Sequence, residues 1–185
     1  MDTFKALLPF LTFILGVMLT PYVEGRKEKS KIATLKKNIL TELEDELLTL
    51  EKSIKVTNDS IQKRKYQSSR FKHISLGKRF EPLLLKKNIG DVYSSFNKDT
   101  RIALKNILLL SDQIKLKYDS VVDNWKIDNH ICQANEESMI FSMLSIYWVL
   151  NKLLNEGDRF HLPDLASDEF VEMAAKALQI PTPYK

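Results

Sequence analysis

The residues best suited to metal or acid–base chemistry gather between positions 130 and 161. His130 and Cys132 are separated by one residue, Glu136 and Glu137 follow them, and His161 comes later. Cysteine and histidine are preferred zinc ligands, but structural zinc sites are usually built from two close pairs, and this stretch offers one. The spacing therefore predicts a loop histidine and a half-buried cysteine, with no metal and no cofactor.

Cys132 is also the only residue of its type, so no internal disulfide can form. As a nucleophile it would need a base beside it, and His130 lies two positions away in a predicted turn, which is a poor arrangement. The sequence contains no phosphate-binding loop, dinucleotide fingerprint, nucleophile elbow or H-E-x-x-H motif. We expect a protein that is not an enzyme. A site assembled from scattered residues around His130 and His161 stays open as an alternative.

A basic stretch with interleaved aromatic residues, QKRKYQSSRFKHISLGKRF, occupies residues 62–80 and contains no acidic residue. Its plainest interpretation is a solvated loop. Basic groups between rings also suit an acidic protein surface, or phosphate contact combined with base stacking. A recognition tip for a protein partner is therefore the second interpretation, and nucleic-acid binding is the third. The residues expected to make either kind of contact are Lys63, Arg64, Lys65, Tyr66, Arg70, Phe71, Lys72, Lys78 and Arg79.

The N-terminal segment passes abruptly from apolar to charged. Residues 6–23 carry no charge, and as a helix they would extend about 27 Å, close to the roughly 30 Å of a bilayer core. We predict a permanent transmembrane anchor at residues 1–25, in preference to a cleaved signal peptide or a core helix. Positive charge beside a span favours the cytoplasmic side, so the N-terminus is expected outside the inner membrane and the rest of the chain in the cytoplasm. The residues expected to contact anionic lipid are Arg26, Lys27, Lys29 and Lys31.

No glycine or proline interrupts residues 28–66, which predicts one long helix. Aliphatic residues recur along it at alternating spacings of three and four, the spacing of a heptad seam. Packing of this seam against other helices of the same chain is the plainer interpretation, and a homotypic coiled coil is the alternative. The seam residues available for self-association are Leu40, Leu43, Leu47, Leu50, Ile54 and Ile61.

The remaining sequence predicts a loop or hinge at residues 67–80 and then three or four helices. A short helix is expected to open at Pro82 and to be interrupted at residues 88–91, and Asn97 or Asp99 is expected to cap a helix that runs to about Trp125.

Two further helices are expected near the C-terminus. Asn135, followed by two glutamates, is expected to begin the central apolar helix, which would end at Gly157. Ser167 is expected to begin the last helix, which would end before Pro181.

The predicted fold is therefore all-α, with one N-terminal transmembrane helix followed by a long stalk helix that packs into a cytoplasmic helical bundle. The expected divisions are the anchor at 1–25, a basic juxtamembrane segment and coiled-coil-like helix at 26–66, and a helical domain at 67–185.

The stretch LTFILGVMLTPYVEGRKEKSKIATLKKNILTELEDELLTLEKSI resembles the start of many small bacterial inner-membrane proteins. Gly16 within the apolar run, the basic residues of 26–37 and residues 41–44 carry the likeness, which covers the first third of the chain. The resemblance implies the topology and a bacterial source, and it carries over no functional residue. Some similar proteins are components of phage-defence loci. The expected function is a membrane-anchored adaptor or effector subunit that recruits a partner or self-associates.

Overall fold

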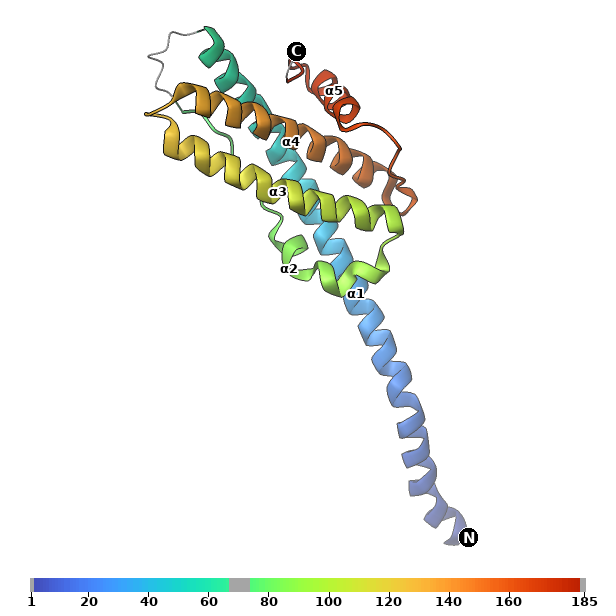
Figure 1. Ribbon diagram of the computed structural model, residues 1–185. Helices are drawn as coiled ribbons and strands as arrows, with labels where there is room; N and C mark the ends of the chain where they lie inside the picture. The colour runs from blue at the N-terminus through green and yellow to red at the C-terminus, as the bar shows by residue number, and fades with distance from the viewer. Residues whose placement is uncertain (1, 67–73, 184–185) are drawn as a thin grey trace.

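The protein is built from helices joined by short loops (Figure 1). The computed structural model describes residues 2–66 and 74–183, with side chains described for residues 13–65 and 74–183. Within these residues no strand is present, which confirms the all-α prediction. In chain order the elements are α1 (Asp2–Tyr66), α2 (Leu83–Val92), the 3-10 turn η1 (Tyr93–Ser95), α3 (Lys98–Asn124), α4 (Asn129–Glu156), the 3-10 turn η2 (Gly157–Arg159) and α5 (Ser167–Leu178).

Helix α1 has two parts with different surroundings. Its N-terminal part projects away from the other helices, and its C-terminal part runs through the bundle (Figure 1). Ile39 is the first fully buried side chain along it. At 1.5 Å per residue, the helix is about 100 Å long. The predicted long stalk helix is confirmed, and it begins at residue 2 rather than residue 28.

The projecting part of α1 carries the segment that the sequence predicts to be a membrane anchor. No helix within the described residues contains an eighteen-residue stretch apolar enough to cross a bilayer. Residues 1–12 of the predicted anchor lie outside the residues whose side chains are described. Beyond them, eight large apolar side chains are exposed: Phe13, Ile14, Leu15, Val17, Met18, Leu19, Tyr22 and Val23.

Helix α4 is the centre of the bundle and packs against α1, α3 and α5. The predicted central helix is thereby confirmed, but its predicted start at Asn135 is wrong. The helix begins one and a half turns earlier, because the Asp128 carboxylate accepts hydrogen bonds from the backbone N–H groups of His130 (2.8 Å) and Ile131 (3.1 Å). Asn135 instead lies inside the helix, where its amide donates to the Ser120 hydroxyl at 3.0 Å.

The heptad seam of α1 is covered by the protein's own helices. Leu43, Leu50, Ile54 and Ile61 are buried in the common core, and Leu40 and Leu47 are half-buried. The prediction that these residues form a self-association seam is therefore wrong, because α2 and α4 already occupy that face. The plainer interpretation, packing of the seam within the chain, is confirmed.

Helix α2 is capped by a side chain from α1. The predicted start after Pro82 is confirmed, but Pro82 supplies no capping side chain. The carboxylate of Glu42 accepts hydrogen bonds from the backbone N–H groups of Leu84 (2.7 Å) and Leu85 (2.9 Å). It therefore satisfies two N–H donors of the first turn that have no partner within the helix. The predicted interruption at residues 88–91 is wrong, since α2 continues through Gly90.

The other predicted helix ends are confirmed. Asn97 caps α3 by accepting from the Thr100 N–H at 2.7 Å. Gly157 ends α4 with a φ of 57°, a conformation that favours glycine. Ser167 begins α5, and Gln179 ends it in the left-handed conformation.

Glu46 of α1 lies beside the loop at residues 74–82. Burial raises the pKa of its carboxyl, against the lowering effects of the Glu81 backbone N–H and of Lys78, whose amine is 4.0 Å away. Glu42, one turn away, adds like-charge repulsion that raises the pKa further. A carboxyl whose pKa is raised by folding stabilises the fold while it is protonated, and this contribution is lost as pH rises through the folded-state pKa.

We therefore expect Glu46→Gln to stabilise the protein at pH 7, by at least the about 0.2–0.5 kcal/mol of a like-charge pair one turn apart. The gain should disappear below the ordinary glutamate pKa of about 4.3. Urea unfolding at pH 7 and at pH 4 would measure both free energies. Glu44→Gln, on the exposed side of the same helix, is the control. An equal gain at both pH values would contradict the assignment to charge.

Candidate functional site

Arg64, predicted to be an exposed contact residue, is instead a core residue. Its side chain and that of Glu136 are both fully buried. The Arg64 Nε donates to Glu136 Oε2 at 2.8 Å and its Nη2 donates to Oε1 at 3.1 Å, while Nη1 donates to the Asn129 Oδ1 at 2.6 Å. The Ser60 hydroxyl completes the network by donating to Glu136 Oε1 at 2.9 Å. This network, hereafter the Arg64–Glu136 lock, fastens the C-terminal end of α1 to α4.

One sequence signal could have identified Arg64 as a buried residue. Positions 54, 57, 61 and 64 continue the alternating steps of three and four along α1, so Arg64 falls on the buried seam. The neighbouring lysines instead suggest that Arg64 is exposed, and the sequence predicts that Glu136 lies at the start of a helix.

Arg79 is also engaged within the chain. Its guanidinium forms an ion pair with Asp119 and lies 4.4 Å from the centroid of the Tyr118 ring, so it ties the loop to α3. Because two of the arginines predicted for recognition are used internally, a nucleic-acid surface along 62–80 is weakened as an alternative.

Three lysines of the predicted recognition tip are exposed. These are Lys63, Lys65, whose amine lies 3.5 Å from a carboxylate oxygen of Glu137, and Lys78. The remaining predicted contacts, namely the side chains of Tyr66, Arg70, Phe71 and Lys72, lie outside the described residues.

The residues considered for metal binding or nucleophilic chemistry are separated in the structure. Cys132 is fully buried rather than half-buried, with its sulfur 3.7 Å from the Val121 carbonyl oxygen. Burial raises the pKa of the thiol, which disfavours the reactive thiolate. His130 is exposed, and His161 pairs with Asp99 at the far end of α3. Among the described residues, no three histidine, cysteine, aspartate or glutamate side chains are placed to hold a metal ion.

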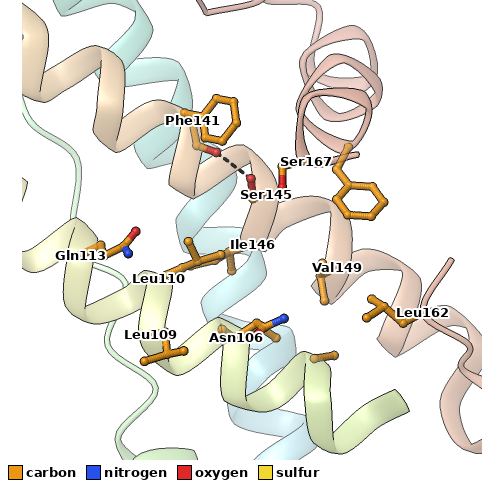
Figure 2. Close-up of a pocket in the computed structure, with 13 residues that line it drawn as sticks. Asn106, Leu109, Leu110, Gln113, Phe141, Ser145, Ile146, Val149, Leu162 and Ser167 are labelled. Atoms are coloured by element: carbon orange, nitrogen blue, oxygen red, sulfur yellow. Dashed lines mark hydrogen bonds between the residues drawn. The ribbon is translucent and has the colours of Figure 1, made fainter. Parts of the chain in front are cut away.

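A groove of about 320 Å³ opens between α3, α4 and α5 (Figure 2). Its lining is mainly aliphatic and aromatic, and its polar members are uncharged: Asn106, Gln113, Ser145 and Ser167. The Ser145 hydroxyl already donates to the Phe141 carbonyl at 3.0 Å, as the dashed line in Figure 2 marks. The groove offers apolar contact with a few amide groups at its rim, and this composition suits binding rather than acid–base chemistry.

Helix α5 forms one wall of the groove. The Phe170 ring of α5, which lines the groove, stacks on Trp148 of α4 with 4.5 Å between centroids. This contact fixes α5 against α4 at one side of the groove. The sequence does not predict the groove, because it depends on the relative placement of three helices.

The outer face of α3 continues the apolar surface beyond the groove. Ile102, Leu109 and Leu116 follow one another at intervals of seven residues and are 39%, 55% and 70% exposed. Leu109 also lines the groove, so the two surfaces are contiguous. The apolar surface of the bundle therefore extends along much of α3.

The residues predicted to contact anionic lipid follow the exposed apolar part of α1. Arg26, Lys27, Lys29 and Lys31 are all exposed. The Arg26 guanidinium lies 5.4 Å from the centroid of the Tyr22 ring. Lipid contact by these residues stays a prediction.

Comparison with known proteins found no relative of this chain. No family model, no curated protein and no solved structure matches it.

Proposed function

We propose that this protein is a non-enzymatic, membrane-anchored helical interaction protein, in which the start of α1 fixes the chain at the bacterial inner membrane and the bundle recruits a partner. The observation that carries the proposal is the row of eight large apolar side chains exposed on α1 beyond the bundle. Burying one such side chain is worth about 1.5–3 kcal/mol, so a row of this length strongly favours an apolar environment around it.

The charges next to this row support the proposed orientation. Basic residues at a lipid surface contribute about 1 kcal/mol each, and Arg26, Lys27, Lys29 and Lys31 follow the row directly. Tyr22, with Arg26 over its ring, has the amphipathic character of a residue at the headgroup level. In the proposed orientation the N-terminus is outside and the bundle is in the cytoplasm.

The length of α1 would hold the bundle away from the lipid surface. Ile39, where full burial begins, lies sixteen positions after Val23, and this stretch extends about 24 Å. The Debye length is about 8 Å at physiological salt, so lipid charge has little influence on the bundle. Its groove and its exposed lysines would be accessible to a cytoplasmic protein partner, and phage defence is one context for such recruitment.

The test is flotation of the full chain with vesicles of neutral phosphatidylcholine, with and without anionic lipid. The native protein is expected to float with both. Changing Leu15, Met18 and Leu19 to aspartate should leave the protein at the bottom of the gradient. Each aspartate in a membrane-embedded helix costs about 2.5–3.5 kcal/mol, so the combined loss of partitioning exceeds about 1,000-fold.

The matched control carries three aspartates at exposed aliphatic positions of the bundle. Leu48, Leu83 and Ile127 are 61%, 66% and 80% exposed, so the control adds the same charge to the same type of residue. It should float like the native protein. Flotation of the Leu15, Met18 and Leu19 variant to the native extent would overturn the proposal.

A further inference from the structure

The outer face of α3 presents a self-complementary pattern of apolar and charged residues. A period of seven residues returns to nearly the same side of a helix. Ile102, Leu109 and Leu116 therefore form one apolar stripe, and each of these side chains is exposed. An exposed stripe of this kind commonly marks a contact surface.

The charges along one edge of the stripe change sign at its middle. Lys98, Lys105, Asp112 and Asp119 also follow one another at intervals of seven residues, so they share a single flank of α3. The two lysines are exposed, and the two aspartate side chains are 58% and 44% exposed. The flank is thus basic in its N-terminal half and acidic in its C-terminal half.

A second copy of α3 running antiparallel would satisfy both patterns. With Leu109 on a two-fold axis, Ile102 of each copy faces Leu116 of the other. The same register places Lys105 opposite residue 113 and Lys98 opposite residue 120, one position from Asp112 and Asp119 respectively. A two-fold axis also brings the same flank of each helix together, so each lysine meets an aspartate of the other copy.

We propose that the outer face of α3 is a homodimer interface, formed by two antiparallel α3 helices related by a two-fold axis through Leu109. The contact adjoins the groove, since Leu109 belongs to both surfaces. The inference is independent of membrane anchoring, because it uses residues of the bundle alone. It also relocates self-association from the buried seam of α1 to α3.

The existing ion pairs of the two aspartates leave their side chains partly exposed. Asp119 pairs with Arg79, and its side chain is 44% exposed. Asp112 pairs with Lys86 at 2.8 Å, and both side chains are more than half exposed. Exposed ion pairs contribute little, so Asp112 can share its charge with a lysine of the second copy. A single pair of helices buries less than the roughly 1,600 Å² of a standard interface, so we expect a dissociation constant on the order of micromolar.

The first experiment is sedimentation of the full chain in mild detergent across a concentration series. Leu109→Glu places two carboxylates together on the axis and should weaken dimerisation about 100-fold. Leu48→Glu changes an aliphatic residue of similar exposure on α1 and should leave the dimer intact. A chain that stays monomeric to about 100 μM, or a dimer that Leu109→Glu leaves unchanged, would overturn the proposal.

The second experiment tests the antiparallel direction. Lys105→Asp alone should weaken the dimer about tenfold, and Asp112→Lys alone should do the same. The double variant should restore native affinity, because each new charge again faces its opposite. Single variants of native affinity, or failure of the double variant to recover, would overturn the register. In a parallel dimer residue 105 faces residue 105 of the other copy, so the single variants would lose no pair of opposite charges.

Cross-linking provides a direct check of the axis. Cys132 is buried, so a cysteine introduced on α3 is the accessible thiol among the described residues. Oxidation should join Leu109→Cys to itself. It should join Ile102→Cys to Leu116→Cys in a mixture, but should join neither of these to itself. Self-linking of Ile102→Cys as efficient as that of Leu109→Cys would overturn the assignment.

Discussion

The Arg64→Ala variant is expected to lose about 3–5 kcal/mol of folding free energy, because it leaves a buried carboxylate without its cation. Glu136 would keep only the Ser60 hydroxyl, at 2.9 Å, of the groups that the Arg64–Glu136 lock supplies. A loss of this size is a large fraction of the 5–15 kcal/mol that stabilises a typical domain. For a chain of this length it corresponds to a fall in Tm of about 10 °C or more.

Urea and thermal unfolding followed by circular dichroism would measure this loss. Lys63→Ala, the exposed neighbour on the same helix, is the control and should change stability by less than about 0.5 kcal/mol. Replacing both members, as Arg64→Met with Glu136→Leu, should recover most of the loss, since no unpaired charge then remains. An Arg64→Ala variant within 1 kcal/mol of the native protein would show that the lock contributes little.

The second large effect is expected from Gly77→Ala. A Cβ atom at Gly77 would lie 2.4 Å from the Ser53 Cα and 2.5 Å from the Ser53 Cβ, so the backbone of the loop or of α1 would have to move. The displacement would also strain the hydrogen bond from the Ser53 hydroxyl to the Lys78 carbonyl, which is 2.8 Å long. We expect a destabilisation of about 1–3 kcal/mol.

Gly90→Ala is the matched control. Gly90 lies within α2, where an added Cβ would meet nothing within 4 Å. Alanine is favoured over glycine in a helix by about 1 kcal/mol, so this variant should stabilise the protein. The same chemical change is therefore expected to act with opposite signs at the two positions. Equal unfolding free energies for the two variants would contradict the close approach of the loop to α1.

The sequence predicts the helices well where their ends depend on local groups. Asn97, Gly157 and Ser167 mark helix ends by chemistry that acts within a few residues, and all three are confirmed. The start of α4 was misplaced because Asp128 and Asn135 are both good capping residues. Local chemistry does not decide which of these two residues caps α4. The hydrogen bond from Asn135 to Ser120 on α3 does, because it engages the Asn135 side chain elsewhere.

The candidate sites were harder to predict because they join distant parts of the chain. Arg64 and Glu136 are 72 positions apart, so a single sequence gives no reason to pair them. The heptad seam was correctly recognised as apolar, yet its partner could have been a second copy or the chain itself. Only the packing of α2 and α4 decides this. The groove likewise exists because three helices meet without filling the space between them.

The continuity of α1 has a mechanical consequence. About 55 Å of the helix lies before Ile39 and about 42 Å lies after it, without a break in between. Because no break interrupts the helix, a tilt or a turn imposed on its free end is transmitted to the part that is packed in the bundle. There the motion would load the contact of α1 with α4, the helix against which α3 and α5 pack. A pull on the N-terminal arm is therefore carried into the contacts of α1 with the bundle rather than absorbed by a hinge within the helix.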